Sequence, residues 1–135
     1  MRRLFLGLAA LLILGLTGAV RASPLLECAV LSAEAAELNA CLGAQLEVSY
    51  GAMEEALALA RGRAEALDQA AGGDAAVLGV EASQQAFAAY RDTLCRTEAT
   101  FVDSTRAADV ELACEIALTR ARTDALLRLG LLGPN

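Results

Sequence analysis

Apolar residues recur at helical spacing along most of this chain, and no stretch alternates with the two-residue period of a β-strand. The first helical pattern covers about residues 32–71, where Ser32 is a candidate N-cap and the glycine pair in the segment 72–74 is a stop signal. Gly43 and Gly51 lie inside this pattern as candidate bends. The pattern therefore predicts one long or bent helix.

Two further helical patterns follow, separated by a polar break at residues 103–105. In the first, over about 75–101, Val80, Phe87, Leu94 and Phe101 repeat every seven residues with Tyr90 between them, which predicts a core-facing stripe. The second covers about 107–129, and its predicted inner face consists of Val110, Cys114, Leu118, Ala121 and Ala125. Together the patterns predict an all-α fold, a small helical bundle built on an αα-hairpin.

The first 22 residues differ from the rest of the chain, because two arginines precede an apolar run at residues 4–20 that carries no charge. Val20 and Ala22 then supply the small residues expected before a cleavage site at Ser23. We therefore expect residues 1–22 to be a signal peptide and residues 23–135 to form one periplasmic or secreted domain. The alternative is an uncleaved membrane anchor, since the run is just long enough to span a bilayer.

Removal of residues 1–22 would leave eight arginines, no lysine and 17 acidic residues, for a net charge of −9. This balance opposes binding to nucleic acids and anionic membranes, and it favours encounter with a cationic partner. An acidic surface that only keeps an exported protein in solution is the alternative interpretation.

Four cysteines lie in the exported part: Cys28, Cys41, Cys95 and Cys114. An even number in an oxidising compartment predicts two disulfides, for which three pairings are possible. The midpoint between Cys95 and Cys114 falls inside the break at 103–105, and antiparallel helices bring such residues together, so we expect these two to pair. Cys28 and Cys41 then pair by elimination. Because 13 residues of continuous helix would separate their sulfurs by about 20 Å, the segment before Ser32 must fold back.

The sequence contains few residues or motifs that are typical of an enzyme active site. Histidine and lysine are absent, and neither a Gly-x-Ser-x-Gly nor a Ser-x-x-Lys motif occurs. The acidic pairs Glu54 with Glu55 and Asp109 with Glu111 lack the facing geometry of a hydrolase, because such neighbours on a helix point to different sides, and we expect them to be solvated. The cysteine spacing contains no close pair for zinc. We therefore predict a protein that is not an enzyme and has no metal or other cofactor.

Polar residues and cysteines recur at helical spacing in the last two segments: Gln84, Phe87, Tyr90, Arg91, Asp92 and Cys95, then Cys114, Leu118, Thr119, Arg122 and Leu126. This arrangement resembles the LprI-type lysozyme-inhibitor family of small exported bacterial proteins. The family pattern runs Gln-x-x-Trp-x-x-aromatic-Arg-Asp-x-x-Cys, and later Cys-x-x-x-x-Thr-x-x-Arg-x-x-x-Leu. A segment at 37–41 extends the resemblance, whereas Phe87 stands in place of the usual tryptophan, and Tyr50, Met53 and Glu54 replace a further family motif.

The resemblance implies a helical domain that inhibits lysozyme. Within it, Arg91 and Arg122 have two interpretations. They pack in the hairpin interface against nearby carboxylates, which is the architectural interpretation, or one of them reaches the catalytic carboxylates of a bound lysozyme. We expect the Thr119 hydroxyl to bond back to its own helix, and the turns at 72–74 and 103–105 are candidate contact loops.

The sequence as a whole therefore predicts an exported binding protein that inhibits a cationic lysozyme, or another cell-wall hydrolase, by occluding its active-site cleft. The alternative is a structural or interaction protein of the cell envelope that has no effect on lysozyme.

Overall fold

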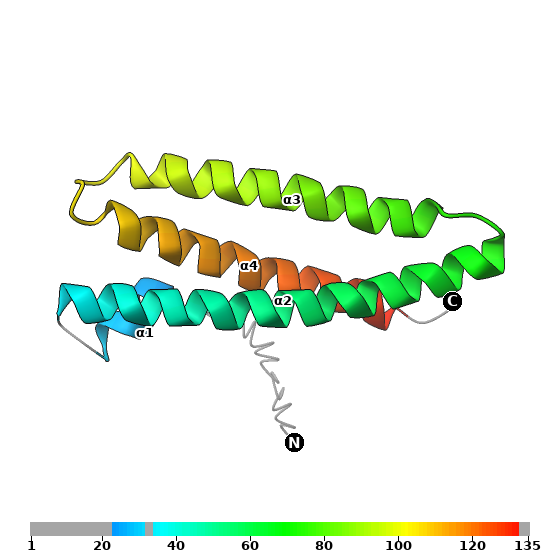
Figure 1. Cartoon of the computed structure of the whole chain (residues 1–135), viewed down its shortest axis with the longest axis horizontal. Helices are drawn as coiled ribbons and strands as arrows, with labels where there is room; N and C mark the ends of the chain where they lie inside the picture. The colour runs from blue at the N-terminus through cyan, green and yellow to red at the C-terminus, as the bar shows by residue number, and fades with distance from the viewer. Residues whose placement is uncertain (1–22, 32–33, 133–135) are drawn as a thin grey trace, which may run out of the picture.

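A computed structural model describes residues 23–31 and 34–132. The expected signal peptide and the candidate N-cap Ser32 lie outside these ranges. Within them the chain forms four helices and no strand: α1 (Pro24–Ala29), α2 (Ala35–Ala71), α3 (Ala75–Ala99) and α4 (Ala107–Leu131). Figure 1 shows α2 along the whole bundle, the antiparallel pair α3 and α4 beside it, and α1 near the start of α2. The predicted all-α bundle built on an αα-hairpin is confirmed.

The long helix α2 continues through Gly43 and Gly51 without a break. Close packing does not require glycine at either position, because a Cβ atom there would meet nothing within 4 Å. Among the described residues, no helix combines the length and the apolar character needed to cross a bilayer.

The turn between α2 and α3 is organised by Asp68. Gly72 adopts the left-handed conformation with φ of 73°, and both Gly72 and Gly73 donate their N–H groups to the Asp68 carbonyl at 2.8 and 3.0 Å. The Asp68 carboxylate then accepts the N–H groups of Ala76 and Val77, each at 2.9 Å. One residue in the last turn of α2 therefore closes that helix and caps the next one.

Small residues on α2 let α4 pack closely against it. The larger core cluster consists of Met53, Ala56, Leu57, Ala60, Ala64, Val80 and Leu126. At the C-terminal end of α4, a Cβ atom on Gly130 would lie 2.8 Å from Cγ of Leu59, so this close approach requires glycine. A second cluster surrounds the first disulfide and consists of Cys28, Leu42, Ala113 and Ile116.

The predicted core stripe of α3 is only partly correct. Val80 is buried, but Tyr90 and Phe101 are 57% and 83% exposed. Phe101 lies two residues beyond the end of α3 at Ala99, in the turn that leads to α4, so the seven-residue repeat does not place it on the buried face of that helix. The buried line instead passes through Arg91 and Cys95.

The prediction for the inner face of α4 was also wrong, because a different side of this helix is buried. The buried residues are Ala113, Ile116, Thr119 and Leu126, whereas Ala121 from the predicted face is exposed. The physical reason is that α4 packs more extensively against α2 than against α3, so its most buried line turns toward α2. The sequence pattern reported mainly the side that meets α3.

Both predicted disulfides are present. Cys28 pairs with Cys41 and Cys95 pairs with Cys114, with Cα–Cα distances of 5.8 and 5.4 Å. The segment before α2 folds back as expected, but it does so as the short helix α1, which the sequence analysis missed. Pro24 occupies its first turn, where the missing N–H group has no intrahelical partner to lose.

We expect Asp68→Ala to lower the free energy of unfolding by about 1–3 kcal/mol, because it leaves the first N–H groups of α3 without their carboxylate acceptor. Urea unfolding followed by circular dichroism measures this change. Asp74→Ala is the matched control, since Asp74 sits at the N-cap position, is exposed and makes no side-chain cap. Equal losses in the two variants would contradict the assignment of the cap to Asp68.

Candidate functional site

Arg91, a family-motif residue of α3, meets Tyr50 of α2 inside the bundle. The guanidinium carbon of Arg91 lies 4.9 Å from the centroid of the Tyr50 ring and 5.7 Å from that of Phe87. Its Nε and Nη2 atoms donate to Oδ1 of Asp92 at 3.0 and 2.7 Å. A cation in contact with two ring faces and a carboxylate is stabilised from several directions.

Arg122 of α4 approaches the Phe87 ring as well, with its guanidinium carbon 5.6 Å from the centroid. Its Nε donates to Oε1 of Gln84 at 2.9 Å, and its Nη2 donates to Oγ of Ser83 at 2.6 Å. The side-chain amide of Gln84 donates in turn to the sulfur of Met53 at 3.7 Å. Burial lowers the pKa of Arg122 from its ordinary value, while the hydrogen bonds hold its side chain in place.

We call Tyr50, Arg91, Phe87 and Arg122 the arginine ladder. Arg91 is only 9% exposed and Arg122 is half-buried, so both guanidinium groups belong to the contacts between the helices. This placement is the architectural one of the two interpretations, but only Arg91 is held by a carboxylate, since the partners of Arg122 are Gln84 and Ser83. Phe87, which stands where the family has tryptophan, is the ring that the two cations share.

Three other motif residues lie apart from the ladder. Tyr90 is exposed, and Leu126 is buried in the main core cluster. Thr119 is fully buried, but the prediction for its hydroxyl was wrong: Thr119 Oγ1 has no hydrogen-bonding partner among the described residues. The back-bonding residue is Thr123, whose hydroxyl donates to the Thr119 carbonyl at 2.9 Å. The threonine that bonds back lies one helical turn after the predicted one, and the spacing of threonines in the sequence does not show which of the two forms this bond.

The outer end of the ladder opens into a shallow cavity of about 290 Å³ lined by Tyr50, Arg91, Asp92, Arg96, Glu111 and Glu115, which we call the polar pocket. Asp92 is occupied by Arg91, and Arg96 donates from Nε to the Asp92 carbonyl at 2.9 Å. Glu111 and Glu115 lie one turn apart on α4, and within the described ranges neither accepts a hydrogen bond nor forms a salt bridge. Glu111, expected to be solvated, is half-buried here.

Burial raises the pKa of the Glu115 carboxyl above its ordinary value, since it penalises the charged form. Arg91 opposes this shift, whereas the negative charges of Asp92 and Glu111 add to it. Burial likewise raises the pKa of the Tyr50 hydroxyl, against the opposing charge of Arg91. The polar pocket therefore holds negative charge that its own arginines do not fully neutralise.

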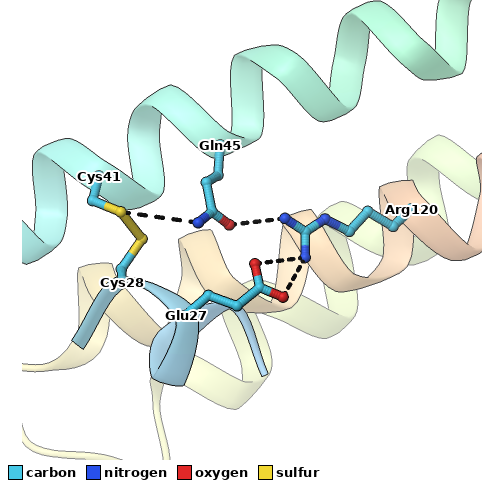
Figure 2. Close-up of a disulfide and its surroundings, with 5 residues drawn as sticks. All are labelled: Glu27, Cys28, Cys41, Gln45 and Arg120. Carbon is cyan, nitrogen blue, oxygen red and sulfur yellow. Dashed lines mark hydrogen bonds and ion pairs between the residues drawn. A yellow bond between two sulfur atoms is a disulfide. The ribbon is translucent and has the colours of Figure 1, made fainter. Parts of the chain in front are cut away.

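A second polar network holds α1 in place beside the first disulfide. Figure 2 shows Arg120 of α4 reaching between α1 and α2. Its Nη1 donates to both carboxylate oxygens of Glu27 at 2.9 and 3.0 Å, and its Nη2 donates to Oε1 of Gln45 at 2.8 Å. The Gln45 amide lies 3.9 Å from the sulfur of Cys41. All of these groups have partners within the protein, so we assign this network to the fold.

Sequence reasoning found the members of the motif but not their partners. The sequence pattern marked Tyr50 only as a departure from the family motif, and it gave no sign of the network of Glu27 and Arg120. Residues 93 positions apart leave no local signal of their contact. The turns at 72–74 and 103–105 lie at opposite ends of the bundle in Figure 1.

We expect Glu115→Gln to stabilise the protein at about pH 7 and to have no effect at about pH 3. Because the folded pKa is raised above the ordinary 4.5, the carboxyl is protonated in both states at low pH and carries no penalty. As the pH rises through the folded pKa, charge builds up in a partly buried site and stability falls. Thermal unfolding at the two pH values measures the difference, with exposed Glu65→Gln as the control. A loss of stability at about pH 7 would contradict this account.

Comparison with known protein families matches residues 28–126 to the family described as lysozyme inhibitor LprI. No curated protein and no solved structure matches the chain. The matched region extends from the first disulfide cysteine to Leu126, so it contains both disulfides, the arginine ladder and the polar pocket. The match covers well over half of the 135 residues, and the chain belongs to the lysozyme inhibitor LprI family.

Proposed function

We propose that this protein is exported and inhibits a cationic lysozyme by docking its polar pocket at the rim of the substrate cleft, so that the helical bundle occludes the active site. The family match across both disulfides carries the proposal. Inhibition is what the family description states, whereas occlusion and the choice of surface are our inference. In this account residues 1–22 direct export and are then removed.

The charge of the polar pocket supports the choice of surface. Glu111 and Glu115 stand one turn apart without a salt bridge in the described part of the chain, and burial, with the nearby charges of Asp92 and Glu111, raises the pKa of Glu115. A lysine or arginine side chain from lysozyme would supply the missing cation and form charge-assisted hydrogen bonds. The inhibitor thus contributes carboxylates and not the arginine that the alternative interpretation required.

The covalent and cation–π links between the helices that line the polar pocket support inhibition by a rigid, folded surface. The Cys95–Cys114 bridge joins α3 and α4 close to Asp92 and Glu115, which line the pocket from those two helices. The ladder joins the same helices to α2 through Tyr50. A surface held in one arrangement loses little conformational entropy on binding, so more of the contact energy appears as affinity.

Long-range attraction adds to the local contact. With a net charge of −9 after removal of residues 1–22, the protein would be attracted to a cationic lysozyme before the surfaces meet. This steering acts mainly on the association rate and weakens as salt screens the charges. The same charge opposes attachment to nucleic acids and to anionic membranes.

We expect the oxidised protein to slow the lysis of cell walls by a c-type lysozyme in a dose-dependent manner. A sample reduced and alkylated at all four cysteines should lose this effect, because both staples are broken. The turbidity of a cell-wall suspension measures lysis, and circular dichroism reports the helicity of each sample. Absence of inhibition by the helical, oxidised protein at large molar excess would refute the proposal and favour an interaction protein of the envelope.

We expect the double variant Glu111→Gln with Glu115→Gln to weaken inhibition about tenfold or more, because it removes both uncompensated carboxylates from the polar pocket. Glu54→Gln with Glu55→Gln is the matched control, since it changes the net charge by the same amount at an exposed pair on α2 outside the pocket.

The control pair separates contact from steering. It should reduce inhibition only slightly, and less as the ionic strength rises, because screened charges act mainly on encounter. Equal effects of the two double variants would reject the polar pocket as the contact surface while leaving inhibition by another surface intact.

A further inference from the structure

A second cavity lies at the end of the bundle away from the polar pocket, where the C-terminal parts of α2 and α4 meet the start of α3. It encloses about 570 Å³, within the range of about 300–1,000 Å³ that is typical of small-molecule sites. Its walls are mainly aliphatic, with Ala60, Ala64, Leu67, Val80, Leu129 and Leu132 among the lining residues. We call it the distal pocket.

The apolar walls of the distal pocket remain open to solvent. Leu67, Leu129 and Leu132 are 46%, 41% and 61% exposed although all three line the same cavity. Clustered exposed leucines lose the free energy that burial would provide, and such clusters in folded proteins mark surfaces that bind something apolar.

Among the residues that the structure describes, Arg63 is the one charged residue in the lining of this cavity. Within the described part of the chain its guanidinium group forms no ion pair and donates no hydrogen bond, and its Nε atom is buried without an acceptor. A buried donor without a partner costs free energy that a bound anion would recover. The other polar residue of the lining, Ser83, already accepts a hydrogen bond from Arg122 at 2.6 Å.

We propose that the distal pocket binds an amphipathic anion with a single alkyl chain, of the fatty-acid carboxylate class. The chain lies along the leucine and alanine walls, and the carboxylate pairs with Arg63. The described lining residues include no aromatic side chain on which a planar base or sugar ring could stack, and a single cation matches a single carboxylate better than it matches a polyphosphate. This site is separate from the polar pocket and does not rest on the proposed inhibition of lysozyme.

Gly79 offers a way to close the pocket without disturbing the fold. It lines the cavity, and a Cβ atom there would meet nothing within 4 Å, so Gly79→Leu places an alkyl group in the ligand volume. Gly62→Leu is the matched control, because Gly62 is also helical, exposed and free of close neighbours but does not line the cavity. Both variants replace glycine by a better helix former.

The test uses displacement of 1-anilinonaphthalene-8-sulfonate by dodecanoate, below the concentration at which dodecanoate forms micelles, with uncharged dodecanol as the matched ligand. We expect saturable binding of dodecanoate with one site per chain. Arg63→Gln should weaken dodecanoate by about tenfold or more and change dodecanol by less than about twofold. Arg106→Gln, outside the pocket, should change neither.

Gly79→Leu should abolish binding of both ligands, whereas Gly62→Leu should retain it. Failure of the oxidised protein to bind dodecanoate saturably would overturn the proposal, as would equal weakening of both ligands by Arg63→Gln. Concentration-dependent self-association that Gly79→Leu removes would also overturn it, since a second copy would then occupy the pocket. Inhibition of lysozyme, measured on the same variants, should be unchanged, so the two proposals fail independently.

Discussion

Two guanidinium groups packed against one phenylalanine hold the three long helices in register. Arg91 contacts Phe87 and also Tyr50 of α2, and Arg122 of α4 approaches the same Phe87 ring. The chain has few aromatic residues and many alanines, and these cation–π contacts join α2 to α3 and α3 to α4 beside the apolar core clusters.

The ladder also explains why a polar pocket exists at the surface. Arg91 forms its inner wall and binds Asp92, so within the described ranges Glu111 and Glu115 of α4 form no salt bridge of their own. Burial and neighbouring negative charge raise the Glu115 pKa, so this carboxylate costs the protein stability at neutral pH. A residue that destabilises the fold at this position needs a reason other than the fold, and the proposed contact with a cationic lysozyme would supply one.

The two disulfides and the arginine ladder stabilise different parts of the bundle. Cys95–Cys114 joins α3 to α4 near their connecting turn, while Cys28–Cys41 fastens α1, which Arg120 also holds through Glu27. At the other end no covalent link is present among the described residues, and the alanines of α2 and Gly130 bring α2 and α4 together. The distal pocket lies at this less constrained end.

Local periodicity in the sequence was sufficient to locate the three long helices and their turns, because each depends on residues close in sequence. Cys95 and Cys114 could be paired because they lie symmetrically about a turn, and Cys28 and Cys41 then followed by elimination. The short helix α1 was too brief to give a periodic signal. Tertiary packing alone decided that Tyr90 and Phe101 face solvent, that Tyr50 meets Arg91, and that Arg63 Nε has no acceptor within the described ranges. Those outcomes depend on how each helix is rotated against its neighbours, and rotation is set by contacts between residues far apart in the chain.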